Sequence, residues 1–179
     1  MNEEYKVVLA GFGGQGILFA GRVLAYSGML SKRQVSWLPS YGPEMRGGTA
    51  NCNVCISNSI IGSPIITEPN VLVAMNRPSF DKFIDAVIPG GIVFADSSLI
   101  EEKINRSDIK HFFIPATEIA KNNDLVGFAN MIILGKIQRE LGISIKETLD
   151  KLQELCVISS KRDIVEKNNK AVMLGYNFS

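Results

Sequence analysis

The chain has few of the side chains that usually carry chemistry. Its 179 residues include three cysteines, one histidine and one tryptophan. An odd number of cysteines without framework spacing excludes a disulfide-stapled scaffold and favours a reducing compartment. No apolar run approaches the roughly 18 residues of a membrane-spanning helix. The acidic start at Met1–Glu4 also lacks the basic and apolar parts of a secretory signal. We therefore expect a cytoplasmic protein that does not enter a membrane.

Neither sign of charge dominates the sequence. Lys and Arg number 19 against 18 Asp and Glu, for a formal net charge of +1, so no global field would attract nucleic acid or an anionic membrane. Hydrophobic residues make up 46% and charged residues 21%, as in ordinary globular proteins. Because no linker, repeat or low-complexity segment interrupts the chain, we expect residues 1–179 to form a single domain.

Apolar runs alternate with amphipathic stretches along most of the chain. Strands are expected at residues 5–10, 34–38, 49–57, 60–66, 71–75, 92–95 and 111–114. Helices are expected at residues 17–27, 117–122, 127–141, 145–155 and 162–174, with another opening at Pro78. Pro39 should end the second strand. Gly142 and Gly175 should cap helices.

This order of elements indicates the fold class. Strands that alternate with helices favour an α/β, Rossmann-like, doubly wound and mostly parallel sheet. A hairpin over residues 49–66, turning at Asn58 and Ser59, would add an antiparallel part. The remainder predicts a helical C-terminal region.

A glycine-rich turn follows the first strand. Gly11-Phe-Gly-Gly-Gln-Gly16 fits the pattern G-x-G-x-x-G between a strand and a helix. The absent side chains would let an oxyanion approach the backbone, and the free N–H groups of the first helical turn would favour its charge. Alternatively, the glycines serve only a sharp turn and close packing.

Nicotinamide binding is disfavoured by what surrounds this turn. A dinucleotide site needs an acidic residue at the end of the second strand, for the ribose hydroxyls. Leu38-Pro-Ser-Tyr41 offers neither a carboxylate there nor an arginine for a 2′-phosphate. The Lys-Ser/Thr pair of a phosphate-loop ATPase is also missing, because Ile17-Leu18 follows Gly16.

A second glycine-rich segment, Tyr41-Gly-Pro-Glu-Met-Arg-Gly-Gly48, follows the second strand. In a doubly wound fold this is the sheet edge where ligands bind. Arg46 could grip a phosphate or carboxylate with two hydrogen bonds, Glu44 could orient it, and Gly47-Gly48 would allow close approach. A rigid loop in which Arg46 satisfies carbonyl groups is the alternative.

Other polar residues suggest structural roles. Cys52 and Cys55 lie three apart on a strand and so face opposite sides of the sheet, which makes them buried structural thiols rather than a metal or disulfide pair. His111 has no clear catalytic partner. Asn130 lies in the most apolar helix and needs a buried hydrogen bond to backbone, or is a site residue. That helix should be deeply buried or contact another subunit.

No residue set has the spacing of an iron–sulfur, metal or thiamine diphosphate site, so we assign no catalytic or metal-binding residue. Cofactor-binding residues are expected in the two glycine-rich segments: Gly11, Gly13, Gly14, Gln15, Gly16, Tyr41, Glu44, Arg46, Gly47 and Gly48. A domain so poor in reactive side chains is not expected to catalyse alone.

Four stretches together resemble the gamma subunit of 2-oxoacid:ferredoxin oxidoreductases, nearest the 2-oxoglutarate and branched-chain types. They are Ala10–Ile17, Ser40–Ala50, Val73–Phe80 and Pro115–Ala120. They occur in order over nearly the whole chain and depart from the pattern at Arg77, where we expect Gln. The resemblance implies that the single domain expected over residues 1–179 is a Rossmann-like gamma domain of this family.

The resemblance implies a function within a complex. Such an enzyme oxidatively decarboxylates a 2-oxoacid to its acyl-coenzyme A and passes electrons to ferredoxin. Thiamine diphosphate, magnesium and iron–sulfur clusters would lie on alpha, beta and delta partner subunits, with coenzyme A as co-substrate. No cofactor would bind to this chain alone, which would be inactive in isolation and free to self-associate. An independent nucleotide-binding dehydrogenase and an anion-binding assembly module are the alternatives.

Overall fold

A computed structural model describes residues 4–40, 49–101, 106–157 and 162–179. Its strands form one sheet in the order β2-β3-β1-β4-β5-β6. They are β1 (Glu4–Phe12), β2 (Gln34–Ser40), β3 (Thr49–Ser57), β4 (Val71–Ala74), β5 (Ile92–Asp96) and β6 (Lys110–Ile114). The helices are α1 (Ile17–Leu30), α2 (Arg77–Phe83), a short 3₁₀ helix η1 (Ile84–Ala86), α3 (Ala116–Asn122), α4 (Ala129–Leu141), α5 (Ile145–Val157) and α6 (Arg162–Asn177).

The sheet has parallel and antiparallel halves. β1, β4, β5 and β6 are parallel neighbours. β3 is antiparallel to both β1 and β2, and lies between them. β2 therefore runs in the same direction as β1, so both strands end at the same edge of the sheet. The predicted α/β class is confirmed, and β3 is the strand that runs antiparallel to its two neighbours.

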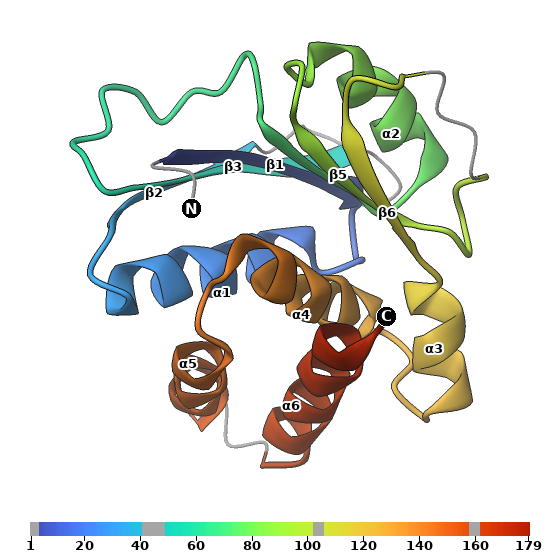
Figure 1. Ribbon diagram of the computed structural model, residues 1–179. Coiled ribbons are helices and arrows are strands. Elements are labelled where there is room, and N and C mark those ends of the chain that lie inside the picture. The colour runs from blue at the N-terminus through green and yellow to red at the C-terminus, as the bar shows by residue number, and fades with distance from the viewer. Residues whose placement is uncertain (1–3, 41–48, 102–105, 158–161) are drawn as a thin grey trace.

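Helices cover both faces of the sheet, as expected for a doubly wound fold. In Figure 1, α2 lies above the sheet, α1 and α4 lie below it, and α5 and α6 form a further layer beneath them. Each face has its own apolar core: one contains Leu9, Leu24 and Ile132, and the other contains Val8, Leu72 and Phe80. Strands buried on both faces explain why the β1 and β4 sequences are nearly continuously apolar.

α4 is the central helix of the lower layers, and residues Asn130–Gln138 are all buried. The deep burial predicted for this helix is thus confirmed. α6 crosses α4 at very close range. A Cβ added at Gly135 or Gly175 would overlap backbone atoms of the other helix, so glycine allows this approach. The prediction of a helix cap at Gly175 was wrong: this residue lies inside α6 and allows close helix packing. Gly142 does cap α4, with a φ of 66°.

Two further predictions from local patterns were wrong. Residues 60–66 form no strand, and the antiparallel partners of β3 are β2 and β1. Pro39 does not end β2, which continues to Ser40. A proline is tolerated there because β2 is an edge strand, with one side free of ladder hydrogen bonds.

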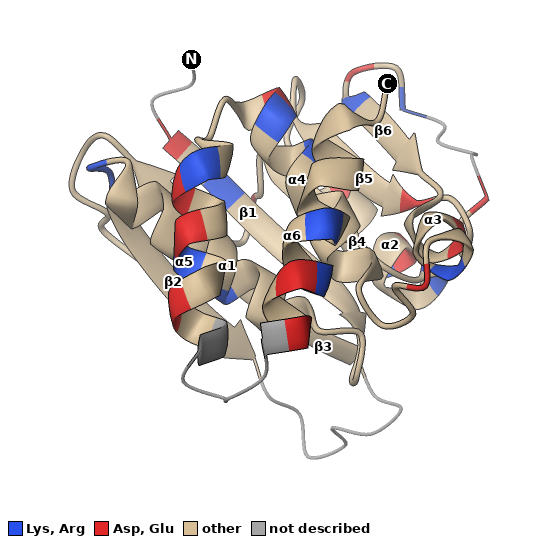
Figure 2. Ribbon diagram, turned by 90° about the horizontal axis from the view of Figure 1, so that it is seen from below, with Lys and Arg blue, Asp and Glu red and all other residues tan. Residues whose placement is uncertain are grey.

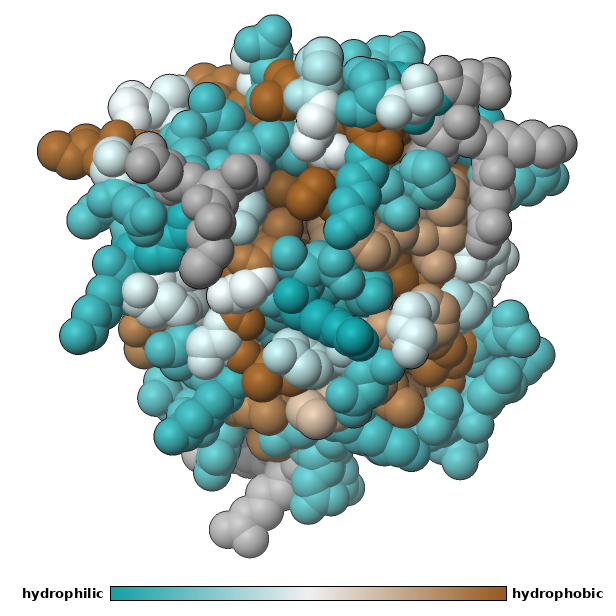
Figure 3. Space-filling view, viewed as in Figure 1, coloured by the Kyte–Doolittle hydropathy of each residue, from teal (hydrophilic) through white to brown (hydrophobic). Residues whose placement is uncertain are grey.

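The surface shows no strong segregation of charge or hydropathy in the views drawn. Acidic and basic residues alternate along α5 and α6 in Figure 2, and apolar side chains appear in separate groups in Figure 3. Among the residues described, the most exposed large apolar side chains are Ile60, Val126 and Ile65. No helix within the described ranges is long and apolar enough to cross a membrane.

Candidate functional site

The glycine turn lies where the sheet changes its direction of winding. β1 ends at Phe12 and α1 begins at Ile17. α1 leads to β2 on one side of β1, whereas β4 pairs with β1 on the other side. In open α/β sheets, ligands bind at such a switch point, outside the carboxyl ends of the strands. The turn therefore occupies the expected position for a ligand site.

Two glycines of the motif make room for protein amides rather than for a ligand. A Cβ added at Gly11 would lie 2.7 Å from Oε1 of Gln15, and one added at Gly16 would overlap the side-chain amide of Asn130. Gly16 also has a left-handed φ of 72°, which strongly favours glycine. For Gly11 and Gly16, close packing is thus the observed role.

The Gln15 side chain fixes the shape of the turn. Its Oε1 accepts a hydrogen bond from Phe12 N at 2.6 Å, and its Nε2 donates to the Met75 carbonyl at 3.0 Å. Met75 directly follows β4, so this one amide fastens the turn to the ends of two adjacent strands. Gln15 was predicted as a site residue. In the structure its side-chain amide holds the turn against the ends of β1 and β4.

Gly14 remains open to a ligand. It is exposed, has a φ of 99°, and no atom lies within 4 Å of an added Cβ. The N-terminal turn of α1 next to it has no side-chain cap and no acidic residue. The free N–H groups of such a turn carry partial positive charge.

A second helix begins beside this turn. Nδ2 of Asn130, the second residue of α4, donates a hydrogen bond to the Gly16 carbonyl at 3.0 Å. α4 also lacks a side-chain cap and an acidic residue in its first turn. The positive ends of α1 and α4 are therefore neighbours, an arrangement that favours an anion more than one helix does alone.

A hollow of about 290 Å³ lies between these two helix starts and α3. Its lining includes Gly14, Gln15, Met75, Thr117, Lys121 and Ala129. The walls are mostly apolar, while Lys121 is exposed and contributes a cation. Such a hollow suits a ligand that combines an anionic group with an apolar part.

Sequence reasoning missed Asp96, a fully buried carboxylate at the end of β5. It accepts hydrogen bonds from the Thr117 backbone N at 3.2 Å and from the Thr117 hydroxyl at 2.5 Å. Asp96 thereby holds the start of α3, which forms one wall of the hollow. An aspartate ending an apolar strand at the carboxyl edge was the available signal.

Half of the predicted site residues fall outside the described ranges: Tyr41, Glu44, Arg46, Gly47 and Gly48. The residues on either side of this segment are described. Thr49 pairs with Phe12, and Ser40 pairs with Asn51. Ser40 and Thr49, which flank the segment, thus lie at the same sheet edge as the glycine turn.

The strand order also bears on dinucleotide binding. In a dinucleotide-binding fold the second strand is the parallel neighbour of the first, which brings its acidic residue to the ribose. Here the antiparallel β3 separates β2 from β1. The end of β2 is therefore one strand farther from β1 than in a dinucleotide-binding fold. This is a second argument against nicotinamide binding, beside the missing carboxylate.

The weaker signals have the structural roles predicted for them. Cys52 and Cys55 are buried free thiols on opposite faces of β3, near the Ile17 and Ser63 carbonyls respectively. Burial raises the pKa of the Cys52 thiol to about 12, against a smaller opposing effect of the Trp37 indole. His111 is exposed on β6 with its ring against Phe113. In the described part of the chain, no three His, Cys, Asp or Glu side chains are grouped to hold a metal ion.

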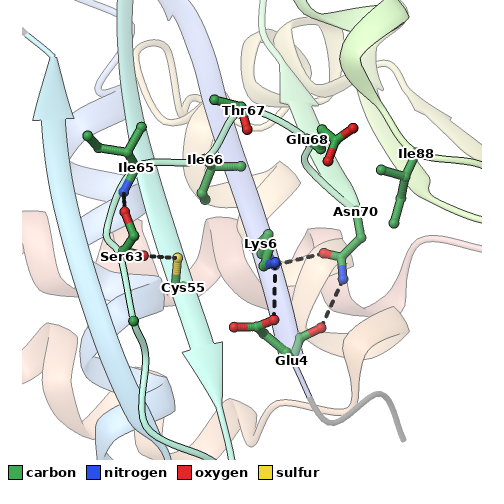
Figure 4. A pocket seen from close by; sticks show the side chains of 11 residues that line it. Glu4, Lys6, Cys55, Ser63, Ile65, Ile66, Thr67, Glu68, Asn70 and Ile88 are labelled. Carbon is green, nitrogen blue, oxygen red and sulfur yellow. Dashed lines mark hydrogen bonds and ion pairs between the residues drawn. The ribbon is translucent and has the colours of Figure 1, made fainter.

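A second hollow, of about 710 Å³, lies at the amino ends of the parallel strands (Figure 4). Three of its polar residues, Glu4, Lys6 and Asn70, bind one another. Lys6 Nζ pairs with Glu4 at 3.3 Å, and the Asn70 side chain accepts from Lys6 N and donates to the Glu4 carbonyl. Because these three residues are already paired and none of the residues lining this hollow begins a helix, we do not assign the ligand site to it.

The fold is that of oxidoreductase gamma subunits. The gamma subunit of a keto/oxoacid ferredoxin oxidoreductase from Geobacter sulfurreducens superposes with a TM-score of 0.77 and 27% identity, over 96% of each chain. The family model described as pyruvate ferredoxin/flavodoxin oxidoreductase matches residues 6–178. The chain therefore belongs to this family, which confirms the resemblance drawn from its motifs.

Curated relatives agree with this assignment. The 2-oxoglutarate synthase subunit KorC of Methanocaldococcus jannaschii is 34% identical, over 96% of this chain and 91% of KorC. The ketoisovalerate oxidoreductase subunit VorA of Methanothermobacter thermautotrophicus is 43% identical over 79% of this chain, but the match spans only 29% of VorA.

A larger solved protein shares the fold. The 2-oxoglutarate:ferredoxin oxidoreductase of Magnetococcus marinus, solved with 2-oxoglutarate, coenzyme A and succinyl-CoA bound, superposes with a TM-score of 0.88. The superposition covers all of this chain and 32% of that one, at 20% identity. The fold of this chain therefore occurs both in small separate subunits and within much longer polypeptides.

Proposed function

We propose that this chain is the gamma subunit of a multi-subunit 2-oxoacid:ferredoxin oxidoreductase, folded as one domain over residues 1–179. The complex would convert a 2-oxoacid to its acyl-coenzyme A and pass the electrons to ferredoxin. Membership of the family and the near full-length match to KorC support this assignment. The cytoplasm is the proposed compartment, since three cysteines without framework spacing favour a reducing environment.

Within that complex, we propose that the carboxyl edge of the sheet holds the anionic part of coenzyme A. The observation that carries this proposal is the meeting of two uncapped helix starts at the exposed Gly14. Lys121 would add positive charge, and Arg46, oriented by Glu44, would bind the anion from the segment that joins β2 to β3. The apolar walls of the hollow would contact the less polar arm of the ligand.

Decarboxylation and electron transfer would rely on thiamine diphosphate, magnesium and iron–sulfur clusters held by alpha, beta and delta subunits. The role of this chain would be to bind and orient the coenzyme A anion. Gly47 and Gly48 would let the ligand approach the backbone at this edge, and Tyr41 would offer it a hydroxyl group and a flat ring.

The assignment can be tested by purifying the chain alone and together with the subunits that assemble with it. We expect 2-oxoacid- and coenzyme A-dependent dye reduction by the complex and none by the isolated chain. A panel containing 2-oxoglutarate and 2-ketoisovalerate would identify the substrate type. Dye reduction by the isolated chain at a rate close to that of the complex would contradict the proposal.

A further inference from the structure

Asn130 connects the two helix starts at the candidate site. Asn130 is 6% exposed, and its Nδ2 donates a hydrogen bond to the Gly16 carbonyl at 3.0 Å. Gly16 is the N-cap of α1, and Ala129, next to Asn130, lines the hollow. One hydrogen bond therefore joins the walls that α1 and α4 contribute to the hollow.

The geometry of the peptide bond gives this contact a consequence for a ligand. The Gly16 carbonyl and the Ile17 N–H belong to one planar trans peptide, so they point in opposite directions. The Gly16 carbonyl also accepts from Ala20 N at 3.0 Å, within the first turn of α1. When Asn130 and Ala20 both hold this oxygen, the Ile17 N–H is fixed pointing out of the start of the helix.

Stability does not explain the choice of asparagine at this position. Oδ1 of Asn130 is buried and has no hydrogen-bond partner among the described residues. A buried polar atom left unpaired is unfavourable, whereas an apolar side chain of similar shape avoids that cost. Asparagine is therefore a poor choice for packing alone, and its donor to Gly16 is the feature that leucine lacks.

We propose that Asn130 is a positioning residue, which holds the Gly16–Ile17 peptide so that its N–H faces the anionic group of coenzyme A. This inference rests on the proposed function of the glycine turn and adds to it the residue that sets the turn's orientation. Asn130 itself does not touch the ligand: it acts through the Gly16 carbonyl, from the side of the turn facing the core.

The test compares Asn130→Leu with Asn168→Leu in the assembled complex. Asn168 is equally buried, at 3% exposure, and its Nδ2 also donates to a backbone carbonyl, that of Ile164 at 2.8 Å. It lies on α6, so Asn168→Leu controls for the loss of a buried amide. Steady-state kinetics give KM for coenzyme A and kcat, and hydrogen–deuterium exchange reports protection of residues 13–20 by coenzyme A.

For Asn130→Leu we expect KM for coenzyme A to rise about three- to tenfold, the effect of one lost hydrogen bond, with kcat within about twofold. Protection of residues 13–20 by coenzyme A should weaken in the same variant. Asn168→Leu should change neither quantity. Should Asn130→Leu fail to assemble, Asn130→Asp keeps the shape, removes the donor and should raise KM further, because its charge would repel the anion.

The outcomes separate this inference from the proposed function. If coenzyme A protects residues 13–20 in the unmodified complex, but Asn130→Leu and Asn130→Asp leave KM and protection unchanged, the role of Asn130 is refuted and the proposed site stands. If coenzyme A protects nothing at residues 13–20 in the unmodified complex, the proposed site fails, and the role of Asn130 fails with it.

Discussion

The amino and carboxyl edges of the sheet are each fastened by one amide side chain. At the amino edge, Asn70 fastens the start of β1 to the residue before β4 with two hydrogen bonds, to Lys6 N and the Glu4 carbonyl. At the carboxyl edge, Gln15 fastens the end of β1 to the end of β4, again with two. Both amides hold the same pair of strands together.

The edges differ in which polar groups remain available. The amino-edge hollow is the larger, at about 710 Å³ against 290 Å³, yet Lys6 and Glu4 there bind each other. The carboxyl edge has two helix starts without side-chain caps and an exposed glycine. Available backbone donors, more than volume, therefore indicate where an anion would bind. The following predictions test this comparison.

The largest effect is expected from Gly16→Val. The left-handed backbone at this position disfavours a branched side chain, and its Cβ would overlap the Asn130 amide. Together these should destabilise the chain by about 3 kcal/mol and lower Tm by roughly 6–12 °C. Gly62→Val, in the open loop of the amino edge, is the control and should stay within about 0.5 kcal/mol. Equal melting of both variants would show that the glycine turn is not constrained as described.

Gln15→Leu and Asn70→Leu form a matched pair. Each substitution removes two hydrogen bonds from a side chain to the backbone. Each should therefore lower the free energy of unfolding, measured by chemical denaturation, by about 1–2 kcal/mol. Only Gln15→Leu should also raise KM for coenzyme A, by several-fold, since it releases the turn at the proposed site. A comparable rise in Asn70→Leu would remove the functional distinction between the edges.

A smaller, pH-dependent effect is expected at Glu140, near the end of α4. Partial burial alone would raise the pKa of this carboxyl group, but Lys136 and Lys110 bind it and hold its pKa below the usual value. The folded pKa is therefore below the unfolded one, so the stabilisation is present above the unfolded pKa and is lost as pH falls through the folded pKa. Denaturation of Glu140→Gln and the unmodified chain between pH 7 and pH 3 should show their difference shrinking with acidity. A constant difference would contradict the lowered pKa.

The sequence was sufficient for the fold class because its signals were local and strong. Continuous apolar runs predicted β1, β4 and β5, and the glycine pattern predicted the turn before α1. The position of β3 between β1 and β2 was not predictable, because the pattern of residues 49–57 is equally typical of a strand that forms a hairpin with residues 60–66. Gly175 looked like a helix cap, and only the close crossing of α4 and α6 reveals its role.

The candidate site was predicted in outline but not in its internal contacts. The position of the glycine turn followed from strand-turn-helix order. That Gly11 and Gly16 accommodate Gln15 and Asn130 depends on tertiary packing, in the case of Asn130 across more than one hundred residues. Asp96 was missed for the same reason, since its partner Thr117 follows another strand.

A structure of the assembled complex with coenzyme A bound would test the central claim most directly. We predict a phosphate oxygen of coenzyme A within about 3 Å of a backbone nitrogen between Gly14 and Leu18, with Lys121 on the same side of the ligand. A phosphate bound elsewhere, with Gly14 covered by side chains of a neighbouring subunit, would contradict it.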